Sequence, residues 1–459
     1  MTHKNPILGG AISRRTFLER SALGMAGLFL GSEFFLSRAG AESAVLPTVV
    51  KAGGGKAKSV IQIWLWGGPS HIDTFDPKPG AGYDYCGPLS TPLTTNVAGI
   101  QISQQLPLLS KMADKYSLLR GMTHGNNGHE TAAYMVQTGR KSDSGPVCPG
   151  LGALVSYFKG YNGGYKGLLP PYITVTEPQG RFSEAGFLGS KYKPFSTGGD
   201  PGRDPFTVEG IVSESITDSR QRDRRALLEN LDGLAKSMSA DPVVKSVKEN
   251  QNEAYEIILG ATGKAFAVAE ETAEVRDRYG RTKFGQSCLL ARRLVERGVP
   301  FITINHQGWD THKKHFQAMN QKLPELDKGL SALLQELHDR GLLESTIVWV
   351  GGEFGRTPKI QWEAPWDGGR GHYGKAFSTL IAGGGFKGGM VVGKTDERGE
   401  TVIERPIYPW DLVGSMLELL NIDPHGKLVT PQGEEVFVSP LANNEIPAKE
   451  TGGLLREIM

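Results

Sequence analysis

The chain has 459 residues, which is enough for one large α/β domain or two domains of ordinary size. Hydrophobic residues make up 39% and charged residues 22%, as is typical of a globular protein. The first 41 residues hold five of the 51 basic and two of the 49 acidic residues, so the remainder has 46 basic and 47 acidic groups and a net charge of −1. This near-neutral balance gives no electrostatic case for nucleic-acid binding, and we expect no nucleic-acid partner.

The N-terminal segment carries an export pattern. Arg14 and Arg15 precede an apolar stretch at 22–30, and Ala39-Gly40-Ala41 follows as a small-residue cleavage site. This pattern is typical of a twin-arginine (Tat) signal peptide over 1–41, although a chance arginine pair before a buried helix is the alternative. The apolar run is too short to span a bilayer, and no later segment offers about 20 apolar residues. We therefore expect a periplasmic or extracellular protein with no transmembrane segment after signal removal.

Short apolar strands alternate with amphipathic helices along 42–459, which we expect to form one domain. Strands are predicted over 59–66, 116–121, 172–176, 299–304, 346–350 and 378–382. Helices are predicted over 287–297, 326–337 and 410–420. This order predicts an α/β fold with a mainly parallel central sheet and helices on both faces.

Residues from about 180 to 280 interrupt this alternation. They begin as a loop rich in glycine, proline and serine and continue as a charged helical stretch over 219–281. We expect a loop and helical insertion beside the sheet.

Three cysteines allow at most one intramolecular disulfide. The spacing of Cys86 and Cys148 permits a bond between them but does not decide it. Cys288 lies in an apolar helical pattern and is expected in the core.

Histidines gather next to the predicted strands. Seven of the ten histidines fall in four segments: 67–76, 123–130 and 305–315, which follow strands, and 369–375, which precedes one. They are His71, His124, His129, His306, His312, His315 and His372. A fifth segment, 351–358, adds Glu353 and Arg356. Because open parallel sheets bind ligands at the carboxyl ends of strands, we expect a shared polar site there.

This mixture of residues suits a divalent metal ion. Imidazole nitrogen with carboxylate oxygen favours Zn²⁺ or Mn²⁺, whereas Ca²⁺ or Mg²⁺ would favour oxygen-rich ligation, and the sequence does not decide between them. Each residue also has an ordinary structural interpretation: Glu353 could cap a helix, and Arg356 could pair with it or clamp a phosphate or sulfate. Asp310 and His312, two residues apart, could point to one side of an extended segment.

Five motifs together resemble the DUF1501 family, which is distantly related to the alkaline phosphatase/sulfatase superfamily. They are WGGPSHIDTFDPKP, GNNGHETAAYMVQTGR, GWDTH, GEFGRTP and GRGHYGKAF. The resemblance covers nearly the whole mature chain and implies an alkaline phosphatase-like fold.

The resemblance also implies a set of site residues. The metal ligands would be Asp73, His71, Asp310, His312, Glu353 and His372. His129 and Thr131 would fall near the nucleophile position, and Arg356 would bind the anionic group. Two departures matter: the nucleophile position has no Cys or Ser, and Phe354 replaces the His of an acid-His pair. Thr131 or a water molecule would then attack, with His129 as a ligand or general acid.

The resulting hypothesis is an exported, metal-dependent hydrolase that acts on a phosphate or sulfate ester of a small molecule or glycan. The alternative is a catalytically inactive scaffold that binds an anionic glycan. A third possibility is a structural role with an exported protein partner.

Overall fold

The computed structural model describes residues 55–142, 145–177, 185–204, 206, 208, 223, 263–443 and 445–459. The expected signal peptide at 1–41 and most of the expected insertion at about 180–280 lie outside these residues. In the described part of the chain, no helix has the length and apolar character needed to cross a membrane.

The central sheet has eight strands in the order β12-β4-β11-β8-β1-β7-β5-β6. All six predicted strands are confirmed as members of this sheet, and two short edge strands complete it. In chain order the strands are β1 (Ser59–Leu65), β4 (Tyr116–Met122), β5 (Tyr172–Val175), β6 (Phe195–Ser196), β7 (Phe301–His306), β8 (Thr346–Gly351), β11 (Phe377–Ala382) and β12 (Val391–Val392).

The sheet is mainly parallel, as predicted. β1 pairs in parallel with both β7 and β8, and β5 pairs in parallel with β7. β11 is the exception, because it runs antiparallel to both of its neighbours, β4 and β8. The start of β11 therefore lies at the same sheet edge as the ends of the parallel strands.

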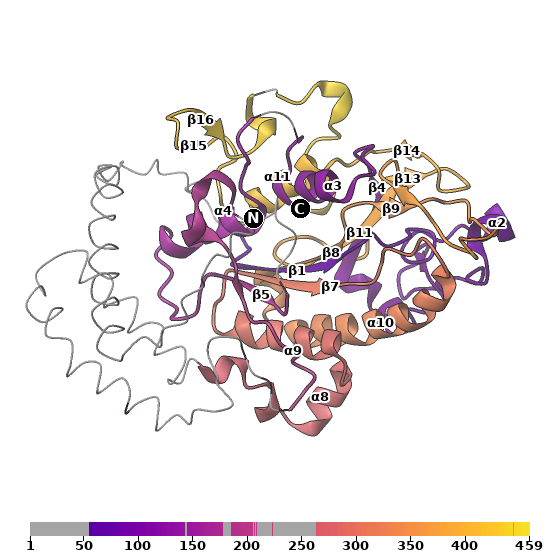
Figure 1. Ribbon diagram of the computed structural model, residues 1–459, viewed down its shortest axis with the longest axis horizontal. Coiled ribbons are helices and arrows are strands. Elements are labelled where there is room, and N and C mark those ends of the chain that lie inside the picture. Colours follow the sequence, from indigo (N-terminus) through magenta and orange to yellow (C-terminus); the bar gives the residue numbers. More distant parts are fainter. Residues whose placement is uncertain are drawn as a thin grey trace, which may run out of the picture. The chain divides into compact units, whose positions relative to one another are not determined.

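Helices cover both faces of the sheet (Figure 1). The α-helices are α2 (Tyr83–Cys86), α3 (His129–Thr138), α4 (Leu151–Val155), α8 (Ala273–Tyr279), α9 (Lys283–Glu296), α10 (His315–Asp339) and α11 (Pro409–Leu419). In Figure 1, α8, α9 and α10 lie below the sheet, and α3, α4 and α11 lie above it. The three predicted helices are confirmed as α9, α10 and α11. α10 begins 11 residues earlier than expected, because Pro324 and polar residues obscured its first turns.

Strand β1 shows why two layers of helices are needed. Ile61, Ile63 and Leu65 belong to one buried cluster with residues of α9 and α10. Val60 and Trp64 belong to a second cluster with residues of α4 and α11. Successive side chains of a strand point to opposite faces, so a strand with apolar side chains on both faces that is buried throughout needs helices on both sides of the sheet.

Four two-stranded ribbons accompany the sheet. They pair β2 (Leu93–Thr94) with β3 (Gln101–Ile102), β9 (Gly355–Arg356) with β10 (His372–Tyr373), β13 (Lys394–Thr395) with β14 (Val402–Glu404), and β15 (Lys427–Val429) with β16 (Glu435–Phe437). Of these four ribbons, the one formed by β9 and β10 carries predicted site residues. Arg356 lies on β9 and His372 lies on β10, and the two residues pair directly.

All three cysteines are buried, and none of them forms a disulfide in the described part of the chain. The disulfide that the spacing of Cys86 and Cys148 permitted is therefore not formed. Cys288 is fully buried in α9, as predicted. Burial raises the pKa of its thiol well above the usual value, which keeps it protonated and unreactive.

Candidate metal centre

Residues from four separate parts of the sheet meet at one edge. Asp310 and His312 follow β7, Glu353 follows β8, and His129 begins α3 beyond the end of β4. His372 arrives from the opposite direction, on β10, just before the antiparallel strand β11. Topology thus gathers side chains that are up to 243 positions apart in the sequence.

His129, Asp310 and His372 form the centre of this group. Each offers one nitrogen or oxygen atom that lies within 4.8 Å of the atoms offered by the other two. Nε2 of His129 is 3.4 Å from Asp310 Oδ2, and Nε2 of His372 is 3.2 Å from Asp310 Oδ1. His312 adds a third ring, whose Nε2 is 3.1 Å from Asp310 Oδ1 and 2.8 Å from His372 Nε2.

The Nδ1 partners of two histidines define which nitrogen faces the centre. Nδ1 of His372 is 2.8 Å from the backbone carbonyl of Asn127, which can only accept, so Nδ1 carries the hydrogen. Nδ1 of His129 is 2.7 Å from Oε1 of Glu353, and the same reasoning applies because this oxygen is an acceptor that also accepts from Gly67 N. In the neutral rings both Nε2 atoms are therefore lone-pair acceptors pointed at a carboxylate that also accepts.

Such a cluster of acceptors needs a positive charge, and its donor set fits a divalent cation. Imidazole nitrogens held by a carboxylate and a carbonyl are the usual arrangement around bound zinc and related ions. Glu353 supports this arrangement from a fully buried position: its Oε1 also accepts from Gly67 N at 2.9 Å. Its Oε2 has no hydrogen-bond partner among the described residues.

The pKa values of His129, His312 and Asp310 are shifted in different directions. The hydrogen bond that His129 donates to Glu353 raises the pKa of His129, against the effect of its partial burial. Burial lowers the pKa of His312, which outweighs the attraction of Asp310. Burial, the largest single influence, would raise the pKa of Asp310, but the hydrogen bond and charge of Arg356 together with His312 and His372 outweigh burial and leave the pKa lowered.

Arg356 is fully buried and holds the backbone around Asp310. Its Nε donates to Gly68 O at 3.2 Å, Nη1 donates to Arg370 O at 3.1 Å, and Nη2 contacts Gly67 O and the Asp310 carboxylate. Four of its five N–H groups are thereby engaged.

Gly67 shows how tightly this edge is built. Its φ of +108° suits glycine, and an added Cβ would lie 2.2 Å from Asp310 N. Any side chain here would displace the loop that carries Asp310.

Asp73 and His71 do not join the group. The Asp73 carboxylate is 2.8 Å from Arg370 Nε and 2.8 Å from His315 Nε2, and all three side chains are fully buried. Burial alone would raise the pKa of Asp73, but Arg370 and His315 hold it at about 2. His71 Nε2 lies 2.8 Å from Gly399 O, and burial lowers its pKa.

Thr131 lies in the first turn of α3, two residues after His129. Within the described part of the chain, no side-chain hydrogen bond connects it to the group. The structure therefore brings together His129, Asp310, His312, Glu353, His372 and Arg356, and it leaves Asp73, His71 and Thr131 outside their contacts.

Three neighbours of the centre were not predicted from the sequence as site residues. Trp66 stacks on the His129 ring, with centroids 6.0 Å apart and planes 18° apart. Asn127 orients His372 through a backbone carbonyl, which no residue-type pattern reveals. Phe354, expected only as a missing ligand, stacks on His372 with centroids 4.6 Å apart.

His124 ties the end of β4 to the end of β8. Its Nε2 is 2.7 Å from the Glu353 carbonyl, and its Nδ1 accepts from Asn126 N at 3.0 Å. Burial lowers its pKa to about 4, so the ring is neutral and holds Glu353 in place at neutral pH.

The sequence matches the family described as "Protein of unknown function (DUF1501)" over residues 57–447. The chain therefore belongs to this family, which confirms the resemblance carried by its five motifs. No curated protein matches the sequence.

Solved structures that are similar to this chain include three at low sequence identity. The PsFucS1 sulfatase from Pseudoalteromonas sp. is 15% identical, with a TM-score of 0.38, over 87% of this chain and 71% of that chain. An alkaline phosphatase superfamily protein from Vibrio parahaemolyticus is 11% identical, with a TM-score of 0.35, over 83% and 71%. The C-terminal periplasmic domain of EcEptC from Escherichia coli, in complex with Zn, is 11% identical, with a TM-score of 0.33, over 89% and 100%.

Proposed function

We propose that this protein is a metal-dependent hydrolase of phosphate or sulfate esters, with its cation held by His129, Asp310 and His372. The observation that carries the proposal is the orientation of the two histidines. Each is fixed through Nδ1 so that Nε2 faces the Asp310 carboxylate. Acceptors arranged in this way are stabilised by a cation between them.

The nitrogen-rich donor set favours Zn²⁺ or Mn²⁺ over Ca²⁺ or Mg²⁺. When bound, such an ion would neutralise the ester anion and polarise the bond to be broken. Asp310, kept ionised by Arg356, supplies the negative charge that retains the ion. Glu353 holds the His129 ring in one orientation.

His312 is the group best placed to move a proton. Its side chain is 38% exposed, which makes it the most open of the three rings, and burial lowers its pKa. At neutral pH it is therefore uncharged and can accept a proton from an attacking water. We propose that water attacks rather than Thr131. A threonine nucleophile needs a neighbouring base, and the nearby His129 ring is already engaged by Glu353 and Asp310.

Metal content and turnover test the proposal together. The full-length protein would be analysed by inductively coupled plasma mass spectrometry and assayed with 4-nitrophenyl phosphate and 4-nitrophenyl sulfate. We expect bound metal and turnover of at least one ester, and loss of both in His372→Ala. His338→Ala, at an exposed histidine near the end of α10, is the matched control and should keep both. A folded, metal-free protein without esterase activity would refute the proposal.

The nucleophile is tested separately. Thr131→Ala should change turnover by no more than about threefold if water attacks. Loss of a covalent nucleophile would instead lower turnover by a factor on the order of 10³ or more.

A second candidate, an inactive scaffold that binds an anionic glycan or a protein partner, is favoured by Phe354. This residue stands where the superfamily places the His of an acid-His pair, and it packs against His372. Bound metal with no turnover, together with binding of a sulfated glycan, would support this candidate over the hydrolase.

We also propose that residues 1–41 direct export by the Tat pathway to the periplasm or beyond. Replacement of Arg14 and Arg15 by Lys should keep the unprocessed chain inside the cell, as fractionation and N-terminal sequencing would show. Export of this variant at the normal level would refute the proposal.

A further inference from the structure

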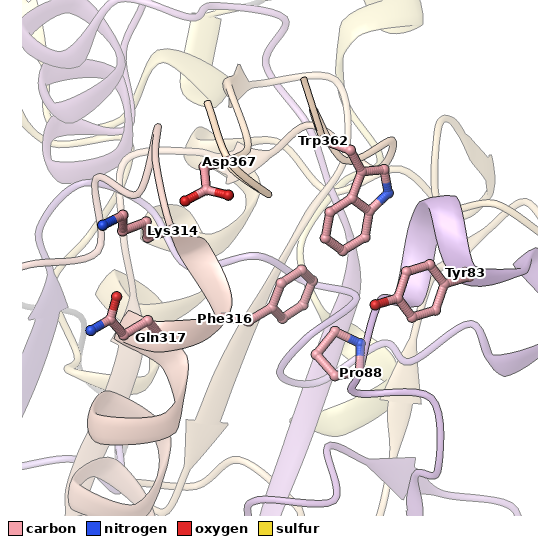
Figure 2. A pocket seen from close by; sticks show the side chains of 7 residues that line it. All are labelled: Tyr83, Pro88, Lys314, Phe316, Gln317, Trp362 and Asp367. Atoms are coloured by element: carbon pink, nitrogen blue, oxygen red, sulfur yellow. The ribbon is translucent and has the colours of Figure 1, made fainter. Parts of the chain in front are cut away.

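A hollow of about 390 Å³ lies beside the loops that carry the candidate metal centre (Figure 2). It is lined by Tyr83, Pro88, Lys314, Phe316, Gln317, Trp362 and Asp367. Figure 2 shows the rings on one side of the hollow and the polar ends of Lys314, Gln317 and Asp367 on the other. The hollow thus offers an apolar surface, hydrogen-bond donors and an acceptor together, as ligand sites do.

Three aromatic rings form a nearly parallel strip along the hollow. The Trp362 ring lies 5.1 Å from Tyr83 and 5.9 Å from Phe316, centroid to centroid, with planes 8° and 18° apart. Tyr83 is 65% exposed and Trp362 is 37% exposed. Large exposed aromatic surfaces of this kind mark binding sites more often than chance exposure.

The Phe316 ring of this strip is closely packed against neighbouring residues. A Cβ at Gly87 would lie 2.4 Å from Cζ of Phe316, so the chain fits closely against that ring. The Arg370 guanidinium carbon lies 5.7 Å from the centroid of the same ring. Lys314 and Asp367, which line the same hollow, have φ of 49° and 50°, an unfavourable backbone conformation for residues with side chains.

The hollow is joined to the candidate metal centre through shared segments. Lys314 is two residues beyond His312, and its backbone N donates to Trp366 O at 3.2 Å. The Trp366 ring is 6.3 Å from the His312 ring. Arg370 contacts Phe316 with its guanidinium, while its carbonyl accepts from Arg356, which holds Asp310. A ligand in the hollow would therefore contact chain segments that also carry residues of the proposed reaction site.

We propose that this hollow binds a pyranose ring of a saccharide. A pyranose has one face of C–H groups, which suits the negative face of an aromatic ring, and a rim of hydroxyl groups. Lys314 and Gln317 can donate to those hydroxyls, and Asp367 can accept from them. A cage for a quaternary ammonium would need ring faces turned toward one point, whereas these rings are nearly parallel.

The substrate part of this proposal, that the protein cleaves an ester on a saccharide, rests on the proposed hydrolase function. Saccharide binding itself does not depend on turnover. The two can therefore fail separately.

Calorimetric titration of the full-length protein tests the site with three probes: cellotetraose, maltotetraose and a chondroitin sulfate tetrasaccharide. We expect at least one to bind. For that probe, Tyr83→Ala and Trp362→Ala should each raise the Kd by about tenfold, and Trp362→Phe by no more than about threefold. Tyr161→Ala is the matched control, because Tyr161 is 47% exposed and lies outside the hollow.

Each outcome decides the proposal. Absence of binding to all three probes, or an unchanged Kd in the folded Tyr83→Ala variant, overturns it. Tyr83 is exposed, so this variant stays informative even where Trp362→Ala fails to fold. His372→Ala should abolish turnover and keep the Kd for a neutral probe within about threefold. Saccharide binding by a wild-type protein without esterase activity would refute the hydrolase and retain the site.

Discussion

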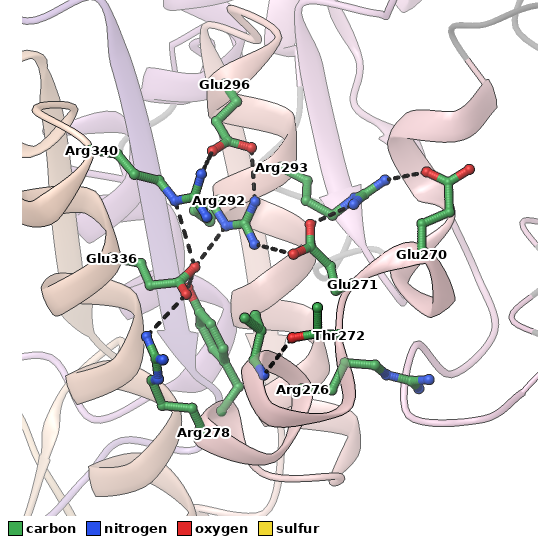
Figure 3. A network of polar contacts seen from close by, with 12 residues as sticks. Glu270, Glu271, Thr272, Arg276, Arg278, Arg292, Arg293, Glu296, Glu336 and Arg340 are labelled. Atoms are coloured by element: carbon green, nitrogen blue, oxygen red, sulfur yellow. Dashed lines mark hydrogen bonds and ion pairs between the residues drawn. The ribbon is translucent and has the colours of Figure 1, made fainter.

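Two groups of charged residues in this protein are built in opposite ways. Around Arg292, beneath the sheet, four arginines are paired with four glutamates (Figure 3): Arg278, Arg292, Arg293 and Arg340 with Glu270, Glu271, Glu296 and Glu336. Arg292 is 2% exposed and lies 2.9 Å from Glu271, 2.8 Å from Glu296 and 2.9 Å from Glu336. The contacts with Glu271 and Glu336 are close ion pairs whose N–H groups are not aligned for hydrogen bonding.

The candidate metal centre has the reverse character. His129, Asp310 and His372 are 27%, 42% and 21% exposed, and although Arg356 contacts one carboxylate oxygen of Asp310, the ring nitrogens of both histidines also face that carboxylate as acceptors. A buried network whose charges are all paired holds elements together, whereas an accessible cluster with surplus acceptors is prepared for a cation. Mutations in the Arg292 network should therefore lower the free energy of unfolding, whereas mutations in the candidate metal centre should weaken metal binding.

The largest effect should come from Arg292→Met. This change leaves Glu271, Glu296 and Glu336 without their shared partner between α8, α9 and α10. Removal of one partner from a buried ion network costs about 3–5 kcal/mol of unfolding free energy. Urea denaturation would measure this loss, and metal content of the folded fraction should stay unchanged. A loss below about 1 kcal/mol would show that the network contributes little.

Asp73 offers a test beside the centre itself. Its folded pKa of about 2 lies below the ordinary value of 3.8, so its ionised form stabilises the fold. That stabilisation is complete above about pH 4 and is lost as the pH falls toward 2; it amounts to about 2 kcal/mol. Asp73 should thus behave like the Arg292 network, despite its place near the metal centre.

Unfolding free energies of wild type and Asp73→Asn, measured at pH 5 and at pH 2.5, would reveal this contribution. The difference between the two proteins should shrink by about 1.5 kcal/mol at the lower pH, because pH 2.5 still lies slightly above the folded pKa. An equal difference at both pH values would mean that Asp73 is not ionised through its pairing with Arg370 and His315.

Glu353→Gln should weaken metal binding without unfolding the protein. Loss of a carboxylate that orients a ligating histidine costs about ten- to a hundredfold in metal affinity. The Kd for Zn²⁺ at pH 8, measured by competition with a chromogenic chelator, would show it. His338→Ala again serves as the control.

The pH dependence of the same variant separates orientation from charge. Glu353 raises the pKa of His129 above 6.5, and the protonated ring cannot bind metal. Wild-type affinity should therefore fall as the pH drops through that raised pKa. In Glu353→Gln the fall should occur at lower pH, although affinity at pH 8 is weaker. An unshifted pH profile would contradict the pairing of His129 with Glu353.

The sequence predicted much of the candidate centre because its residues follow strands. Asp310, His312 and Glu353 stand directly after apolar runs, and parallel strands end at one edge. His372 was predicted although it precedes its strand, and only the antiparallel course of β11 explains its position. Strand order and direction depend on long-range pairing, which local patterns do not encode.

Pairings between distant buried charges were beyond sequence reasoning for the same reason. Asp73 was expected to bind metal, yet it pairs with Arg370, 297 positions away. Carboxylates that bind a cation and carboxylates that bind an arginine look alike in a sequence. Only the packing that brings an oppositely charged side chain within reach tells them apart.

The smallest effect should come from Arg340→Ala, which tests whether burial gives the Arg292 network its strength. Arg340 contacts the same carboxylate as Arg292, at 2.8 Å from Glu296 Oε1, but its side chain is 42% exposed. Solvent screens such a pair, so urea denaturation should show a loss below about 1 kcal/mol, and added salt should reduce it further. A loss as large as that of Arg292→Met would mean that the number of ion pairs, rather than their burial, sets the stability of this region.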